Sequence, residues 1–207
     1  TDSRASRTPA FGDLALAVAQ TDVKGDRSKP PHEQEDPDLY VRVVDRSDEG
    51  IIVRGAKCHT TSSANGDEII VFPTRAMGPD DADYAVSFAV PANTEGLSLY
   101  VSGYGGGGGG HEAFDHPVSS KHKLLETLTV FDDVFVPWER VFLCQEPERA
   151  GALALTFVEY HRFTAVSYKL PLVDAFVGAA AQIAEMNGVI KAGHIRDKLT
   201  HLVAYAE

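Results

Sequence analysis

The sequence predicts an α+β protein, with an antiparallel β barrel or sandwich in its middle and the start of an α-helical bundle after it. Short apolar runs separated by Gly, Pro, Asn and Asp clusters fill residues 21–146, which is typical of strands joined by turns. No helical pattern interrupts these runs, which favours antiparallel pairing in a barrel or sandwich. From residue 147 onward, apolar residues recur at helical spacing instead.

Residues 1–20 are expected to be the end of a helical region that begins further upstream. They start polar and then give a helix-compatible apolar run over Leu14–Ala19. The middle β region then begins at Thr21. Its expected strands are 40–44, 51–53, 69–72, 84–90, 97–101, 127–131 and 134–136.

Six consecutive glycines, Gly105–Gly110, follow the fifth of these strands. With Gly103 they satisfy a dinucleotide-binding spacing trivially. That fingerprint needs a strand before it and a helix after it, and here a turn-like segment follows. We therefore interpret the run as a flexible loop between strands.

Residues 147–207 are expected to form the start of a C-terminal helical region. Two apolar stripes lie on either side of Pro171, which should break or kink the helix there. Asn187-Gly188 should end the second helix, and a further helix should run from about Lys191 to Glu207. Because these stripes need more partners than the β region offers, and the last helix has no stop signal, we expect the chain to be a fragment.

The composition excludes several classes of function. The net charge of −11 and the lack of a basic run argue against nucleic acid as a partner. No apolar stretch of about 18 residues and no signal peptide occur, which argues against a membrane span or export. Cys58 and Cys144 stand alone, which favours reduced thiols in a cytoplasmic protein over a disulfide between them.

Two segments of the β region are candidates for ligand binding. In 21–28, Lys24 and Arg27 could hold a phosphate or carboxylate, with Asp26 fixing Arg27. The residue types alone favour the alternative, a charged surface turn capped by Asp22 and Ser28. In 55–64, hydroxyls and the imidazole of His59 suit the polar edge of a flavin ring, although a Ser/Thr-rich strand end explains them equally well.

One helical segment is a candidate for catalysis. His161, beside Arg162, could act as an acid, a base or a metal ligand, but a lone helical histidine is more often a packed residue. The other histidines show no metal-site spacing, so no metal ligand is predicted. Nucleophile-elbow, Walker, zinc-protease and kinase motifs are missing from the sequence. The residues alone therefore predict a β domain with helices and a ligand site, without an activity.

Several segments together resemble the 4-hydroxyphenylacetate hydroxylase / 4-hydroxybutyryl-CoA dehydratase family. The string 130–142, which contains Phe135 and Trp138, carries the most specific likeness, and we expect both aromatic residues to be structural. The remaining matching segments are 21–28, 54–63, 115–121, 160–162 and 187–199.

The resemblance implies an acyl-CoA-dehydrogenase-like fold, with an N-terminal helical region ending in 1–20, a middle β domain at 21–146 and a C-terminal helical domain starting at 147–207. It implies FAD between the β domain and the helices at a subunit interface, in a homotetramer. The residues that the resemblance assigns to FAD are Lys24, Arg27, His59, Thr61 and Ser63, and those that it assigns to catalysis are His161 and Lys169.

The family catalyses two types of reaction, hydroxylation and dehydration. The residues of the matching motifs resemble the dehydratase branch more. That branch uses FAD and a [4Fe–4S] cluster on a hydroxyacyl-CoA thioester. His161 matches the cluster's histidine ligand, but Tyr168 stands where a cysteine ligand is expected and Ala165 where a catalytic tyrosine is expected. Because tyrosine cannot replace a cluster thiolate, we expect no cluster.

The leading expectation is therefore a monooxygenase that takes reduced FAD from a partner reductase and hydroxylates a phenolic substrate similar to 4-hydroxyphenylacetate. A 4-hydroxybutyryl-CoA dehydratase or vinylacetyl-CoA isomerase is the alternative, with a CoA thioester as substrate. A truncated, non-catalytic family member is the third.

Overall fold

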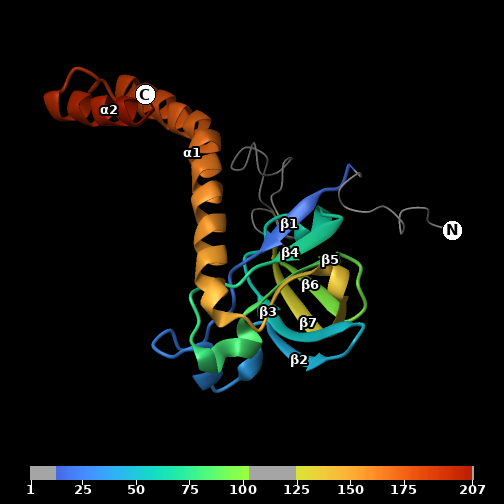
Figure 1. Ribbon diagram of the computed structural model, residues 1–207. Helices are drawn as coiled ribbons and strands as arrows, with labels where there is room; N and C mark the ends of the chain where they lie inside the picture. Colours follow the sequence, from blue (N-terminus) through green and yellow to red (C-terminus); the bar gives the residue numbers. More distant parts are fainter. Residues whose placement is uncertain (1–12, 103–124, 207) are drawn as a thin grey trace. The chain divides into compact units, whose positions relative to one another are not determined.

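The computed structural model describes residues 13–102 and 125–206, and the chain forms two compact units, Thr1–Leu155 and Thr156–Glu207. Figure 1 traces both units along the chain. The glycine run Gly105–Gly110 and the motif segment 115–121 lie outside the described residues.

The first unit contains two four-stranded sheets, with strand orders β1-β4-β5-β8 and β2-β3-β7-β6 (Figure 1). The strand pairs are antiparallel except for β1 and β4, which run parallel. The strands are β1 (Leu16–Ala19), β2 (Arg42–Arg46), β3 (Gly50–Lys57), β4 (Glu68–Val71), β5 (Val86–Pro91), β6 (Leu97–Ser102), β7 (Glu126–Pro137) and β8 (Val141–Cys144). Short 3-10 helices connect them: η2 (Pro31–Glu33), η3 (Pro37–Leu39), η4 (Ser63–Asn65), η5 (Pro79–Tyr84) and η6 (Trp138–Arg140).

The prediction of a helix over Leu14–Ala19 was wrong, because this segment forms β1. Ala17 and Ala19 are buried on one face, and the backbone pairs with β4 from Leu16↔Glu68 to Ala19↔Val71. A short apolar run has no strong preference of its own, so the free edge of β4 decides its conformation. β8 was also missed by the sequence analysis.

The core of the first unit lies between the inward faces of the two sheets. Strand alternation places Val134 and Val136 inside with no exposure, while Phe135 between them is 44% exposed. Phe135 therefore lies outside this core, with its ring close to Gly50 on the neighbouring strand β3. Phe88 and Phe131 meet edge to face at 5.6 Å between ring centroids.

Trp138 follows β7 in η6 and packs, partly buried, against this core. Its indole Nε1 donates to the Ser47 carbonyl at 3.0 Å, and the Arg46 guanidinium lies 4.8 Å from the ring centroid. Trp138 is thus a structural residue at the end of the last long strand.

β7 is one strand where the sequence suggested two. Asp133 has a positive φ of 52°, and the pairing of β7 with β3 shifts between Val53 and Gly55 at the same level. The Arg54 guanidinium bonds the Asp133 carboxylate through two hydrogen bonds of 2.8 and 2.6 Å at this irregularity. The pair links two of the family-like motifs at the surface.

The short helices η2 and η5 are joined by His32 and Asp81. The Asp81 Oδ1 atom lies 2.6 Å from His32 Nδ1 and accepts from the His32 backbone N–H at 3.1 Å. The hydrogen bond to Asp81 raises the pKa of His32 above its usual 6.5. Burial raises the pKa of Asp81, but hydrogen bonds from His32 and the Gly78 backbone N–H outweigh it and leave a net lowering from 3.8.

The second unit holds most of α1 (Pro147–Met186) and all of α2 (Gly193–Ala206). α1 continues through Pro171, so of the predicted break or kink at this position the break does not occur. A proline inside a helix costs about 3 kcal/mol, because one backbone hydrogen bond is lost and its ring clashes with the preceding turn. The other hydrogen bonds of this 40-residue helix offset that cost.

α1 ends where Asn187-Gly188 predicted. Gly188 has a φ of 71°, its N–H donates to Glu185 O at 2.9 Å, and the Val189 N–H donates to Ala184 O at 2.9 Å. This is a Schellman arrangement, which satisfies carbonyls that the helix end leaves free.

Large apolar side chains remain exposed on both helices, as expected for helices that need further packing partners. They include Leu155, Tyr160, Phe163, Tyr168, Leu172, Phe176, Ile183, Met186 and Tyr205. Within 13–102 and 125–206, no helix is long and apolar enough to cross a membrane.

Candidate functional site

A buried ion pair joins the two candidate binding segments of the first unit. Lys57, at the end of β3, lies 2.7 Å from Asp22 (Nζ–Oδ1), and both side chains are 2% exposed. The Lys57 ammonium also donates to Gln20 O at 3.0 Å and Phe72 O at 2.8 Å. Burial lowers the pKa of Lys57, and the Asp22 carboxylate opposes that shift.

Asp22 is held from the other side as well. Its Oδ1 accepts from the Val41 backbone N–H at 3.1 Å, and its Oδ2 accepts from the Thr74 hydroxyl. The alternative that Asp22 caps a surface turn is therefore wrong. This pair holds 21–28 against the end of β3 and fixes the geometry of both segments.

The turn at 24–30 is built around Gln34. The Gln34 Oε1 accepts from the Asp26 N–H at 2.9 Å, and its Nε2 donates to the carbonyls of Asp26, Lys29 and Pro30 at 2.8, 3.2 and 3.3 Å. Gly25 has a φ of 53°, and a Cβ there would lie 2.6 Å from Gln34 Oε1, so glycine is favoured at this position. Gln34 thus fixes the backbone that carries Lys24 and Arg27.

Asp26 does not hold Arg27 as predicted. The Asp26 Oδ1 accepts from the Ser28 hydroxyl at 2.7 Å and from the Ser28 N–H at 2.9 Å, and these bonds lower the pKa of Asp26. Arg27 is exposed. Burial raises the pKa of the Tyr40 phenol. A hydrogen bond from Arg75 and the positive charges of Arg75 and Arg27 oppose this increase.

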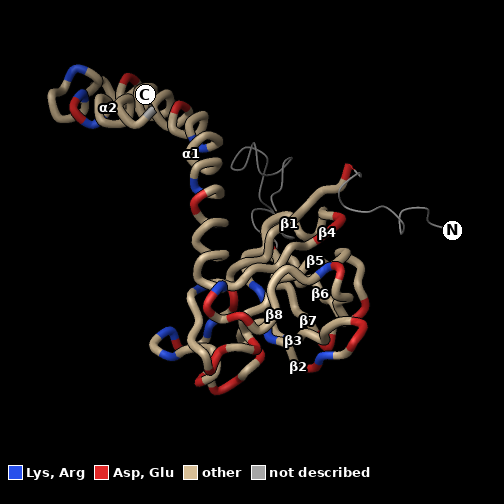
Figure 2. The backbone as a smooth tube through the Cα atoms, viewed as in Figure 1, with Lys and Arg blue, Asp and Glu red and all other residues tan. Residues whose placement is uncertain are grey.

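Lys24 lies close enough to the end of β3 to influence Cys58. Burial raises the pKa of the Cys58 thiol, and the Lys24 charge opposes that increase. In Figure 2, the loops of the first unit carry both basic and acidic residues. Arg27 and Arg75 thus act on Tyr40, whereas Lys24 acts on Cys58.

The hydroxyl-rich loop after β3 pairs with the start of β7. The Thr60 N–H donates to Thr127 O at 3.1 Å and the Ser62 N–H donates to Leu125 O at 2.8 Å. Ser63 is fully buried, and its hydroxyl lies 2.6 Å from that of Thr127. The Ser63 hydroxyl is therefore engaged inside the loop.

The backbone of this loop is strained at two positions. His59 and Ser62 have φ values of 56° and 62°, which non-glycine residues adopt at a cost. The His59 side chain is exposed, and so is that of Thr61. The loop thus presents an imidazole and a hydroxyl at the surface of the first unit.

Glu126, the first residue of β7, was missed by the sequence analysis. The Thr61 hydroxyl donates to Glu126 Oε1 at 2.6 Å. Within the described part of the chain, Glu126 Oε2 and Thr60 Oγ1 are buried without a hydrogen-bond partner. Such atoms need an explanation, since an unpaired buried oxygen costs about 1–3 kcal/mol. The sequence did contain a sign of this role, because Glu126 is an acidic residue at the start of a strand rich in threonine.

These residues fit a flavin nucleotide. Its diphosphate needs cations, which Lys24 and Arg27 offer, and its ring edge needs hydrogen-bonding groups, which His59 and Thr61 offer. Thr60 Oγ1 and Glu126 Oε2 make no hydrogen bond to the described residues, so both atoms could bond to a ligand.

The two residues predicted for catalysis lie in the second unit, on α1. His161 is exposed, and its ring stacks on that of Phe157 at 5.6 Å and 13°. Lys169 is exposed, Tyr168 is 58% exposed, and Ala165 is buried. Among the residues that the structure describes, no three His, Cys, Asp or Glu side chains are grouped as a metal site.

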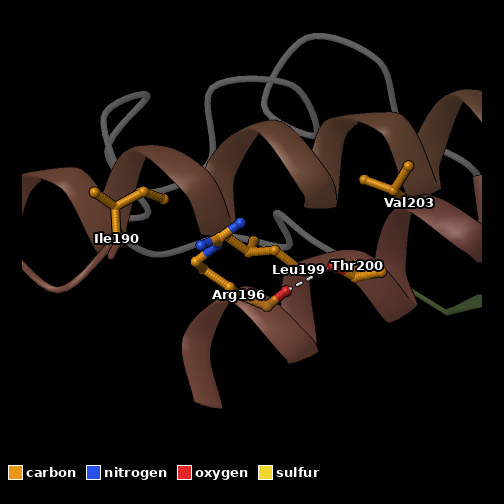
Figure 3. Close-up of a pocket in the computed structure, with 5 residues that line it drawn as sticks. All are labelled: Ile190, Arg196, Leu199, Thr200 and Val203. Atoms are coloured by element: carbon orange, nitrogen blue, oxygen red, sulfur yellow. Dashed lines mark hydrogen bonds between the residues drawn. The ribbon is translucent and has the colours of Figure 1, made fainter. Parts of the chain in front are cut away.

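The second unit has a shallow groove on α2 and the turn before it (Figure 3). It is lined by Ile190, Arg196, Leu199, Thr200 and Val203. The Thr200 hydroxyl donates to the Arg196 carbonyl at 2.9 Å. None of the residues predicted from the sequence as site residues lines this groove.

Family models cover nearly the whole chain. Residues 9–143 match the 4-hydroxyphenylacetate 3-hydroxylase N-terminal model, and residues 150–207 match the C-terminal model of the same name.

Two characterised relatives show both branches of the resemblance. The chain is 44% identical over 198 residues to the 4-hydroxybutyryl-CoA dehydratase/vinylacetyl-CoA-Δ-isomerase of Clostridium aminobutyricum, covering 92% of this chain and 40% of that protein. It is 37% identical over 197 residues to the 4-hydroxyphenylacetate 3-monooxygenase oxygenase component of Thermus thermophilus, covering 94% and 40%. The chain thus spans about 40% of the length of these relatives.

Solved structures agree with the predicted fold. The oxygenase component (HpaB) of 4-hydroxyphenylacetate 3-monooxygenase complexed with FAD matches with a TM-score of 0.82 and 35% identity, over 94% of this chain and 40% of that one. A steroid ACAD variant, an acyl-CoA dehydrogenase, matches with a TM-score of 0.58 at 18% identity, over 93% and 43%. The second match concerns the fold alone.

Proposed function

The chain belongs to the 4-hydroxyphenylacetate 3-hydroxylase family, as its motifs predicted, and on that premise we propose that it forms the flavin-binding core of an FAD-dependent monooxygenase. The fold is acyl-CoA-dehydrogenase-like. The observation that carries the proposal is the loop at 59–63. It offers exposed polar groups beside two unpaired buried oxygens, in a chain that matches a structure complexed with FAD.

In this proposal the first unit binds FAD. Lys24 and Arg27 neutralise the diphosphate, and His59 and Thr61 bond the polar edge of the ring. Ser63 contributes by fixing the loop through Thr127, since its hydroxyl is buried. The proposed domains are a β domain that includes β1 and runs to residue 146, and a helical domain from 147.

The proposed reaction is hydroxylation of a phenol similar to 4-hydroxyphenylacetate. When bound, FADH₂ supplies two electrons to O₂, so that one oxygen atom enters the ring and the other leaves as water. A separate reductase renews the FADH₂. His161, exposed on α1, accepts or returns the proton of the substrate hydroxyl, and Lys169 offers a cation two turns further along the helix. We also propose that the intact protein is a homotetramer in the cytoplasm.

A second candidate is a 4-hydroxybutyryl-CoA dehydratase or vinylacetyl-CoA isomerase. The 44% identity to the Clostridium aminobutyricum enzyme favours it. Two residues weigh against it. Tyr168 carries a phenol where the cluster of that branch takes a thiolate, and Ala165 has no acid–base group where a tyrosine is expected.

The test uses the intact protein, purified without oxygen and supplied with FAD. A flavin spectrum without an iron–sulfur band, less than one iron per subunit, and FADH₂- and O₂-dependent hydroxylation of 4-hydroxyphenylacetate are expected. About four irons per subunit together with dehydration of 4-hydroxybutyryl-CoA would replace the first candidate by the second. Failure to bind any flavin would refute both.

A further inference from the structure

His32 gains and loses its proton at Nε2, not at the nitrogen that bonds Asp81. The Asp81 side chain is 4% exposed and lies 2.6 Å from His32 Nδ1. A carboxylate only accepts hydrogen bonds, so Nδ1 carries a hydrogen and the titrating atom is Nε2. Nε2 lies 3.6 Å from Glu33 Oε1, in a side chain that is 33% exposed. Release of its proton leaves the hydrogen bond to Asp81 but removes the positive charge from the contact.

Negative charges lie on the elements around this ring. η2, which carries His32, packs against η5 and η3. The charges that act on the ring and favour its protonated form are those of Asp80 and Asp81, from η5, and Glu33, from η2. Asp38 of η3 is paired with Arg42 at 2.9 Å. The protonated ring therefore holds η2 to η5 more strongly than the neutral ring does.

The same short helix fixes the turn at 24–30. η2 ends with the hydrogen bond from the Gln34 N–H to Pro31 O at 3.3 Å, and the buried Gln34 side chain makes the four hydrogen bonds to the turn. The turn needs this support, because Lys24 and Gly25 have successive positive φ values of 80° and 53°. A weaker hold of η5 on η2 therefore displaces Gln34 and loosens the turn.

We propose that the contact between His32 and Asp81 makes the order of the turn at 24–30 depend on pH. While Nε2 holds its proton, the charged contact keeps η2 against η5, and Gln34 keeps the turn in place. When Nε2 releases its proton to the solvent, the contact weakens and the turn opens more often. Since the pKa of His32 is raised, this support is complete below pH 6.5 and is lost as the pH rises through the raised pKa.

The consequence for ligand binding rests on the proposed function. Lys24 and Arg27 lie in this turn and are the cations proposed for the diphosphate of FAD. Opening of the turn displaces both cations, so FAD should bind more weakly above the raised pKa of His32 than below it. The turn responds to pH with or without a flavin, so the two effects are measured separately.

Hydrogen exchange of the intact protein without flavin tests the pH dependence of the turn. The protection factor of a peptide containing 24–30 is measured below pH 6.5 and above the raised pKa, with a β7 peptide as the reference for global opening. In the unaltered protein, protection of the turn should fall about threefold relative to β7. His32→Gln keeps a donor for Asp81 but does not titrate, so protection of its turn should be equal at both pH values.

A second variant shifts the transition instead of abolishing it. Glu33→Gln combined with Asp80→Asn removes two negative charges from exposed positions and leaves His32 and Asp81 unchanged. The pH at which protection of the turn falls should therefore move to a lower value. A purely structural contact would give no such shift.

The dissociation constant of FAD is then measured over the same pH range. It should rise about threefold more in the unaltered protein than in His32→Gln. Any titration of the flavin itself affects both proteins equally, so the difference between them reports on His32.

The outcomes separate the inference from the proposed function. Equal protection of the turn at both pH values in the unaltered protein, or a fall of the same size in His32→Gln, overturns the inference and leaves the proposed function standing. A fall that β7 shares in full overturns it too, because the effect is then global. A turn that responds to pH while FAD affinity does not supports the role of the contact and refutes the placement of the diphosphate at this turn. If no flavin binds at any pH, the proposed function fails, and the exchange experiment still decides the inference.

Discussion

The Asp22–Lys57 pair offers the sharpest test of the structure's energetics. Asp22→Asn keeps the shape and one acceptor oxygen of the side chain but removes its charge, and it leaves the Lys57 ammonium buried with two carbonyl partners. At 2.7 Å the lost attraction is about 6 kcal/mol with an effective dielectric constant of about 20. Relaxation and water entry reduce this, so we expect the free energy of unfolding to fall by about 3–5 kcal/mol.

Two companion variants make the prediction specific. Asp22→Asn combined with Lys57→Met removes the buried cation as well, so it should be more stable than Asp22→Asn alone. Arg54→Met breaks a pair with a 2.6 Å contact whose side chains are 39% and 50% exposed, and it should cost less than about 1 kcal/mol.

The assay is urea denaturation of the intact protein, with hydrogen exchange of peptides from β3 to assign the loss to the first unit. Equal costs for Asp22→Asn and Arg54→Met would refute the reasoning that burial decides the energy of these pairs. A double variant that is no more stable than Asp22→Asn would refute the claim that the unpaired ammonium causes the loss.

Three further predictions concern the first unit. Gln34→Ala should remove four hydrogen bonds from the turn at 24–30. The hydrogen-exchange rate of this turn should therefore rise, and FAD binding should weaken. An unchanged exchange rate would contradict this role of Gln34. The raised pKa of His32 means that its contact with Asp81 stabilises fully below pH 6.5 and loses this contribution as the pH rises through the raised pKa. The lowered pKa of Asp81 means that its contribution is present above pH 3.8 and is lost as the pH falls through the lowered pKa. A stability curve measured by thermal unfolding should therefore be highest between these limits, and His32→Gln should flatten its upper limb. Trp138→Ala should cost about 2–3 kcal/mol in urea denaturation, less than the roughly 3–5 kcal/mol of a fully buried tryptophan, because Trp138 is only partly buried.

The sequence by itself determined the features that depend on neighbouring residues. Alternation along 134–136 predicted a strand, and Asn187-Gly188 predicted the end of α1, because side-chain direction and a positive φ are local properties. The motif at 130–142 determined the family, since a long specific string is hard to obtain by chance.

Only the tertiary structure decided the features that depend on distant partners. Leu16–Ala19 became a strand because β4 offered an edge, against its local pattern. Thr61 and Glu126 are 65 positions apart, and Asp22 and Lys57 are 35 apart, so no periodicity in the sequence relates them. Hydrogen bonds and ion pairs require contact within a few ångströms, and only the folded chain determines which distant groups come that close.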